Sequence, residues 1–304
     1  MKKELSILII IVIFLVFQIG ALATPWDVST AEYTGKYKSV TSQEPNPRGL
    51  AFSPDGTKMY VVGTGNDTVY QYTISTEWDV STADYAEKYI SVADEDTQPY
   101  SVVFNSDGTK MYILGKVNAN IFQYTLSPAW DVSTADYADK SISVADEDIY
   151  PIGLAFNPDG DKLYITGDDS NTVYQYTLST GWDVSTASYA DKSVASLDTS
   201  PNGLVFNPDG TKMYMVGNQN DRVWQYTIST GWDVSTAEYA KFKSVTSEET
   251  VPYGLAFSPD GTEMYIVGTN TDTVYQYTLL PGIVWNGVTI TKWNGITVTK
   301  INGK

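Results

Sequence analysis

The chain has 304 residues, a formal net charge of −17, and neither cysteine nor histidine. Catalytic triads that use histidine, zinc sites with imidazole or thiolate ligands, and disulfide bonds are therefore excluded. The negative charge repels phosphate backbones and anionic lipid surfaces, so nucleic acid is not expected as a partner. With 42% hydrophobic residues, the chain can still bury a core.

Residues 1–23 have the pattern of a secretory signal peptide. An apolar run from Leu5 to Val16 follows two lysines, and Ala21-Leu22-Ala23 places small residues where signal peptidase cleaves. We expect a mature, secreted or envelope-associated chain that begins at Thr24. The alternative is an uncleaved N-terminal membrane anchor, because Leu5 to Leu22 is 18 residues and nearly long enough to cross a bilayer.

Five tandem copies of one unit follow the N-terminal segment. The motif Trp-Asp-Val-Ser-Thr-Ala begins at Trp26, Trp78, Trp130, Trp182 and Trp232, with spacings of 52, 52, 52 and 50. Each copy also contains a turn motif ending in Asp-Gly, for example Ser53-Pro54-Asp55-Gly56. Self-similarity at this period is typical of repeat architectures, propellers among them.

Each copy predicts four strands. In the first copy they are expected at Gly49–Phe52, Lys58–Val62, Thr68–Ile74 and Lys88–Val92. The first is a short apolar run that suits an innermost strand, and the third alternates and is rich in β-branched and aromatic residues. The segment around Trp78 is expected to be a connector whose indole fills the space between neighbouring blades.

The order of the strands predicts how the ring closes. An outer-strand segment, Lys36–Val40, precedes any inner strand, while the last copy ends at its third strand, Thr273–Leu279. The N-terminal strand would complete the last blade and remove an exposed edge. We therefore expect residues 24–280 to form an all-β, five-bladed β-propeller of four-stranded blades. An open solenoid would need capping segments, which the sequence does not show.

Residues 281–304 depart from the long repeat. They contain Trp285-Asn286-Gly287 and Trp293-Asn294-Gly295, eight residues apart, each followed by an alternating β-branched run. This pattern predicts a short C-terminal tail with the character of a β-hairpin. Docking on the propeller, self-association and attachment to a surface are all roles compatible with it.

The segments Phe52–Val62 and Asp67–Tyr72 resemble the repeat of YVTN-type propellers. These belong to a broad WD-like superfamily that includes lactonase-like and archaeal surface-layer propellers. The resemblance covers the five copies and implies the propeller fold; propellers host many unrelated functions. Lactonase-like members typically have seven blades, and in this chain Val62 or Gly63 replaces the asparagine of the motif.

Differences among the copies predict a binding face at one end of the channel. They concentrate just before each inner strand and in the loop between the second and third strands. The candidate ligand-binding residues are Arg48, Tyr100, Asn202, Tyr253, Lys116, Asp168, Asp169 and Gln219. Aromatic faces combined with hydrogen-bonding groups suit a sugar. The alternative is that these loops vary because nothing packs on them.

Two acidic triplets are candidate metal sites. The candidate ligands are Asp94, Asp96, Asp146 and Asp148, which lie in the loops of two adjacent copies. Calcium prefers such oxygen ligands, and a solvated acidic loop is the alternative interpretation. No other cofactor is expected.

Together these patterns predict a secreted or cell-surface, non-catalytic binding module for an extracellular glycan or a surface protein. The alternatives are a carboxylate-dependent glycoside hydrolase or lyase, and an envelope or surface-layer structural protein. A hydrolase needs two carboxyls with different tasks, which should break the repeat symmetry. The acids that break it, Asp161, Glu263, Asp168 and Asp169, are expected at opposite ends of the blades and predict no catalytic pair.

Overall fold

The computed structural model describes residues 25–279, 283–285 and 288–290. The predicted signal peptide and its cleavage site lie outside these residues, as does the second half of the tail. Among the residues that the structure describes, no helix is long and apolar enough to cross a membrane.

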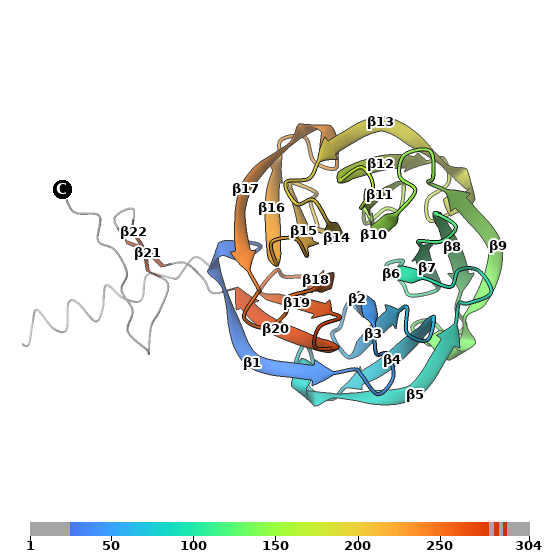
Figure 1. Cartoon of the computed structure of the whole chain (residues 1–304), viewed down its shortest axis with the longest axis horizontal. Helices are drawn as coiled ribbons and strands as arrows, with labels where there is room; N and C mark the ends of the chain where they lie inside the picture. Colours follow the sequence, from blue (N-terminus) through green and yellow to red (C-terminus); the bar gives the residue numbers. More distant parts are fainter. Residues whose placement is uncertain (1–24, 280–282, 286–287, 291–304) are drawn as a thin grey trace, which may run out of the picture.

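Five antiparallel, four-stranded sheets stand around a central channel as the blades of a propeller (Figure 1). The first blade contains β2 (Pro47–Phe52), β3 (Lys58–Gly63), β4 (Thr68–Ile74) and β5 (Ala83–Ser91). The second contains β6 (Pro99–Phe104), β7 (Lys110–Gly115), β8 (Asn120–Thr125) and β9 (Asp136–Ser143). The third contains β10 (Pro151–Phe156), β11 (Lys162–Gly167), β12 (Thr172–Leu178) and β13 (Ala187–Ala195).

The last two blades show how the ring is closed. The fourth contains β14 (Pro201–Phe206), β15 (Lys212–Gly217), β16 (Arg222–Ile228) and β17 (Ala237–Ser244). The fifth combines β18 (Pro252–Phe257), β19 (Glu263–Gly268) and β20 (Thr273–Leu279) with β1 (Ala31–Ser39) from the other end of the propeller. β1 runs antiparallel to β20, with Ala31 opposite Leu279 and Ser39 opposite Thr273. The predicted N-terminal closure is confirmed.

The outer strands begin earlier than the sequence predicted. β5 begins at Ala83 rather than Lys88, and β1 begins at Ala31 rather than Lys36. The reason is a bulge in the middle of the outer strand, where the pairing shifts register between Gln71 and Tyr72. Glu87 takes a φ of 58° there. A bulge interrupts the alternation of a strand, so the sequence pattern showed only the half beyond it.

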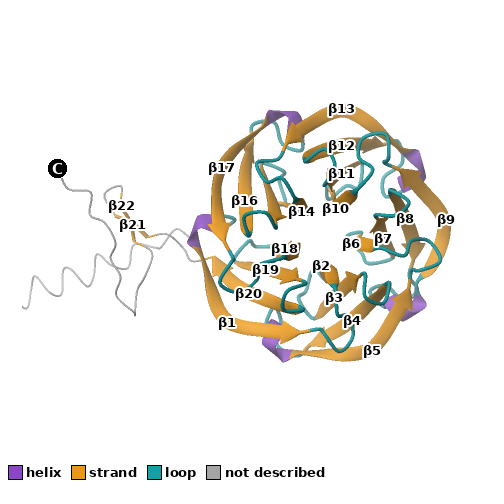
Figure 2. Cartoon of the chain, viewed as in Figure 1, coloured by secondary structure: helices purple, strands orange, loops and turns teal. Residues whose placement is uncertain are grey.

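Short 3₁₀ turns precede the outer strands on the perimeter of the ring (Figure 2). They are η1 (Val28–Thr30), η2 (Val80–Thr82), η3 (Val132–Thr134), η4 (Val184–Thr186) and η5 (Val234–Thr236). In the first blade, Asp79 Oδ1 accepts hydrogen bonds from the Ser81 amide at 3.1 Å and from Ser81 Oγ at 2.6 Å. The repeated aspartate is thus a capping residue.

The connector tryptophans fill the space between blades. The Trp78 ring lies 5.7 Å from that of Phe52 in its own blade and 6.2 Å from that of Tyr265 in the fifth blade. Tyr265 Oη donates a 2.8 Å hydrogen bond to the Trp78 carbonyl. The same three residue types meet at every junction between blades, so aromatic packing takes the place of disulfides.

The described part of the tail is a two-stranded sheet. β21 (Ile283–Trp285) and β22 (Val288–Ile290) pair antiparallel, with Trp285 opposite Val288. These strands confirm that the tail is β-rich, and a hairpin over residues 281–304 stays a prediction. The second copy lies outside the described residues.

Candidate functional site

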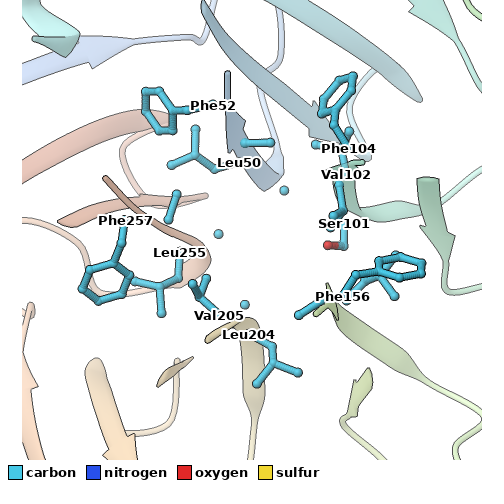
Figure 3. A pocket seen from close by; sticks show the side chains of 18 of the residues that line it. Leu50, Phe52, Ser101, Val102, Phe104, Phe156, Leu204, Val205, Leu255 and Phe257 are labelled. Carbon is cyan, nitrogen blue, oxygen red and sulfur yellow. The ribbon is translucent and has the colours of Figure 1, made fainter. Parts of the chain in front are cut away.

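The inner strands surround a channel cavity of about 300 Å³. Most of the side chains that line it are apolar, and Figure 3 shows Leu50, Val102, Leu204 and Leu255 around a common space. Arg48, Tyr100 and Tyr253 line the same cavity at the ends where the inner strands begin. We call this end the mouth. Among the described residues that line the cavity, the charged side chain is that of Arg48, and it lies at the mouth.

The inner strand of each blade begins with a β-bulge. In the first blade the pairing of β2 with β3 shifts register between Pro47 and Gly49, which leaves Arg48 unpaired. The equivalent residues are Tyr100, Ile152 and Tyr253 in the second, third and fifth blades, and in the fourth blade the shift leaves both Asn202 and Gly203 unpaired. Bulges redirect side chains and are common beside binding sites. The positions at which the copies differ most are thus the positions that the bulges turn out of the ladder.

Arg48 connects three blades through aromatic contacts. Its guanidinium carbon lies 3.8 Å from the ring centre of Tyr253 and 4.9 Å from that of Tyr100. The two rings lie 5.9 Å apart in an edge-on arrangement. Nε and Nη1 of Arg48 are buried and have no hydrogen-bond partner among the described residues. Buried polar groups usually have partners, so this arginine is an exception that needs an explanation.

Lys116, in the loop between β7 and β8, continues the chain of contacts. Its Nζ lies 5.0 Å from the ring centre of Tyr100 and 5.2 Å from that of Tyr150. It also lies 3.8 Å from Asp168 Oδ2. Ser200 Oγ donates a 3.0 Å hydrogen bond to the other oxygen of Asp168. These contacts link the second, third and fourth blades.

Asn202 connects the fourth blade to the fifth. Its side chain is 0% exposed, and Nδ2 donates a 2.8 Å hydrogen bond to the carbonyl of Pro252 in the fifth blade. Its Oδ1 is buried without a partner among the described residues. Thr166 Oγ1 anchors the backbone by donating to the Asn202 carbonyl at 2.7 Å. We refer to Arg48, Tyr100, Lys116, Tyr150, Asp168, Ser200, Asn202 and Tyr253 as the mouth cluster.

Asp169 and Gln219 are not brought into the mouth cluster. Both are exposed and lie one position further along their loops than the residues that face the mouth. In the fourth blade the amide of Gln219 donates to Asp198 Oδ1 at 3.3 Å. Lys116 and Asp168, at the first position of the equivalent loops in the second and third blades, are the residues that join the cluster.

Sequence reasoning missed Tyr150 and Ser200. Each stands two positions before the bulge of its blade, where the other copies carry Asn46, Gln98 and Val251. Comparing the copies two residues further upstream would have found this variable position.

The last acid of each acidic triplet, Asp96 or Asp148, is buried and binds loop amides. Asp96 is only 2% exposed, and its carboxylate accepts hydrogen bonds from the amides of Gln98 at 2.7 Å and Asn118 at 2.9 Å. Asp148 binds the Tyr150 and Ser170 amides in the same way. Equivalent buried acids occur in the other blades, at Glu44, Asp198 and Glu249. These carboxylates hold the mouth loops together.

Asp94 and Asp146, the other two metal candidates, are exposed. The middle residue of each triplet binds a tyrosine. Tyr124 Oη donates to Glu95 at 2.6 Å, and Tyr176 Oη donates to Glu147 at 2.5 Å. Within the described ranges there is no group of three or more acids placed to hold a metal ion. Calcium binding stays a prediction.

Burial raises the pKa of Tyr100 above its ordinary value, while the nearby charge of Arg48 acts in the opposite direction and Asp168 adds to the rise. Tyr100 is therefore a neutral phenol at physiological pH and can both donate and accept a hydrogen bond.

Five four-stranded blades closed by an N-terminal strand define the class of this protein: a β-propeller. No protein-family model matches the sequence, and no curated protein matches it.

Solved structures similar to this chain include propellers of several kinds. A functionally unknown protein from Desulfotomaculum acetoxidans DSM 771 is 15% identical with a TM-score of 0.47, over 73% of this chain and 62% of that one. A putative 6-phosphogluconolactonase from Bacteroides uniformis is 19% identical with a TM-score of 0.48, over 79% and 74%. The Cps50 (Swd1) β-propeller domain of Myceliophteria thermophila is 8% identical with a TM-score of 0.45, over 77% and 84%.

This chain spans less than two thirds of the length of the Desulfotomaculum protein. At identities this low the likenesses concern the fold alone. The site must therefore be interpreted from its own residues.

Proposed function

We propose that this propeller is a secreted or cell-surface, non-catalytic module that binds an extracellular glycan at the mouth cluster. The observation that carries the proposal is the group of Arg48, Tyr100 and Tyr253, in which two aromatic rings surround donors that lack a partner among the described residues. Export is inferred from the signal-peptide pattern of residues 1–23.

The chemistry of the mouth suits a sugar. Pyranose rings present apolar C–H faces that pack on aromatic side chains, and hydroxyls that need directed donors and acceptors. Tyr253 is partly exposed and Tyr150 is 48% exposed, so both offer ring surface to a ligand. Arg48 and Lys116 supply donors, while Asn202 Oδ1 supplies an acceptor without a partner among the described residues.

The rival function, glycoside hydrolysis, needs two carboxyl groups about 5–9.5 Å apart. In the mouth cluster the carboxylate is that of Asp168, which Lys116 and Ser200 contact. The neighbouring Asp148 is used by loop amides. This arrangement favours binding over hydrolysis.

A glycan array probed with residues 24–304 tests the proposal, once in calcium and once in chelator. We expect selective binding that Tyr253→Ala abolishes. Tyr89→Ala is the matched control, because Tyr89 is a 58% exposed tyrosine on the outer strand of the first blade. An array that stays blank in both conditions would overturn the glycan proposal and favour a surface protein as partner. Loss of binding in chelator alone would assign a role to calcium.

A further inference from the structure

We infer that the glycan recognised at the mouth is an acidic one, whose carboxylate binds Arg48 with Lys116 as a second cation. The ligand class is thus a uronate-type sugar. This inference rests on the proposed function, since it names the chemical group that the same site selects.

Arg48 has buried donors without an anion among the described residues. A guanidinium withdrawn from water without charged or hydrogen-bonding partners is strongly unfavourable. Yet Nε and Nη1 are buried without a partner in the described part of the chain, where the ion pairs are all made by lysines. An acceptor that arrives with a ligand would satisfy these donors.

The protein's own acids near Arg48 already have other hydrogen-bond partners. Glu44, four positions before it, accepts hydrogen bonds from the amides of Asn46 at 3.0 Å and Gly65 at 2.7 Å. Asp168 faces Lys116 and Ser200. A chain with a net charge of −17 has many carboxylates, but those of the mouth loops bind backbone amides instead of this arginine.

The guanidinium carbon of Arg48 lies over the rings of both Tyr253 and Tyr100. The N–H groups of an arginine point outward in the plane of its guanidinium. A carboxylate binds in that plane through charge-assisted hydrogen bonds. The sugar ring attached to the carboxylate can then pack on the exposed part of Tyr253, which a small inorganic anion cannot do. Because Nε and Nη1 are buried, a side chain at the mouth must shift to admit the ligand.

Lys116 makes the mouth cluster cationic. Its contact with Asp168, at 3.8 Å, is longer than a hydrogen bond, so the ammonium can turn toward a second anionic group. The cluster therefore offers two cations against one carboxylate, in a protein that is otherwise strongly acidic.

The test is a set of calorimetric titrations with acidic oligosaccharides, namely oligogalacturonate, oligomannuronate and a hyaluronan tetrasaccharide. Each is paired with its carboxyl-reduced, neutral analogue. We expect at least one acidic form to bind about tenfold or more tightly than its analogue, as a charge-assisted pair implies. Arg48→Gln should bring that ratio close to one. Lys116→Gln should also lower the ratio. Because Lys116 lies in a loop, this variant should fold even where the loss of the buried Arg48 prevents folding.

Arg222→Gln is the matched control. Arg222 makes the same kind of aromatic contact, 4.1 Å from the ring centre of Phe242, but on the outer side of the fourth blade. It should leave the ratio unchanged. Equal loss in Arg222→Gln and Arg48→Gln would show a general effect of charge and overturn the inference.

Different results would contradict the carboxylate inference and the glycan proposal. If neutral analogues bind as tightly as acidic forms, and Arg48→Gln leaves the ratio unchanged, the carboxylate inference is wrong while glycan binding stands. If no oligosaccharide binds and the array is also blank, the proposed function is wrong. An oligoglutamate peptide presents the same carboxylate group on a polypeptide. If the peptide binds and the sugars do not, the site is assigned to an acidic protein segment.

Discussion

The guanidinium carbon of Arg48 lies 3.8 Å from the ring centre of Tyr253, and this contact joins the first blade to the fifth. Tyr253 belongs to β18, in the sheet that the N-terminal strand β1 completes. The mouth cluster and the closure of the ring therefore depend on the same blade. A ligand that contacts both residues therefore binds a surface that forms only when the propeller is closed.

Tyr253→Phe should preserve ligand binding, whereas Tyr253→Leu should weaken it. The cation–π contact needs the ring but not the hydroxyl, and such contacts contribute about 0.5–2 kcal/mol. Titration of both variants with the tightest glycan measures the difference. Equal weakening in the two variants would show that the phenolic hydroxyl, not the ring, is what the ligand needs.

A circular permutant should fold, although its termini move to the mouth loops. The permutant begins at Ser42, joins Leu279 to Trp26 through the connector Ser-Thr-Gly, and ends at Thr41. Ser229-Thr230-Gly231 is the natural model for that connector, because it precedes Trp232 at the equivalent place. The pairing of β1 with β20 is kept, so thermal unfolding should stay cooperative. Deletion of residues 24–39 leaves an open edge, and this variant should aggregate or melt at lower temperature. A deletion variant as stable as the parent would contradict the closure mechanism.

Gly56→Ala should be more destabilising than Gly35→Ala. Both glycines have a positive φ, 69° and 79°, so both substitutions carry a left-handed backbone penalty of about 1–2 kcal/mol. At Gly56 the new Cβ would lie 2.4 Å from the Trp78 ring, whereas nothing lies within 4 Å at Gly35. Overpacking typically adds about 1–3 kcal/mol. Denaturant unfolding of the two variants measures that increment directly, and equal losses would mean that Trp78 does not define the turn.

Gln71→Leu should destabilise the junction between the first and second blades. The buried Gln71 Oε1 accepts a 3.1 Å hydrogen bond from the Val132 amide, which would otherwise lack a partner. Leaving that amide unsatisfied should lower the free energy of unfolding by about 1–3 kcal/mol. Thr73→Val on the same strand is the control, because Thr73 is exposed. A loss no greater than that of the control would show that the bond between blades contributes little.

Stability should fall in acid, and Asp131 should account for part of the fall. Burial acts to raise the pKa of Asp131, but hydrogen bonds from Lys88 and Ser133 outweigh it and lower the pKa below 3.8. A carboxyl with a lowered pKa stabilises the fold fully above its unfolded value and loses that contribution as pH falls through the folded value. Asp131→Asn should therefore flatten the decline in unfolding free energy below about pH 4. An unchanged slope in the variant would show that this carboxylate does not contribute.

Much of the fold was predictable because its determinants are local and repeated. Thr68–Ile74 alternates without interruption, and the structure places β4 over the same residues. The outer strands were predicted only in part, because the bulge at Glu87 breaks their alternation. Closure could be inferred from counting strands, since an unmatched N-terminal strand and an incomplete last copy complement each other.

For the candidate site, the sequence predicted where its residues lie along the strands and loops, but it did not predict which of them touch. Comparing the copies located Arg48, Tyr100 and Tyr253, while their convergence depends on bulges that no single copy reveals. The buried role of Asp96 could not be inferred either, because an acidic triplet in a loop gives no sign of which carboxylate turns inward to bind amides.

A crystal structure of residues 24–304 with the tightest acidic oligosaccharide tests the central claim most directly. We expect the sugar at the mouth, its carboxylate within hydrogen-bond distance of Arg48 and its ring against Tyr253. A sugar bound at the opposite end of the channel near Phe52, or on the outer strands near Tyr89, would contradict the assignment of the mouth cluster as the binding site.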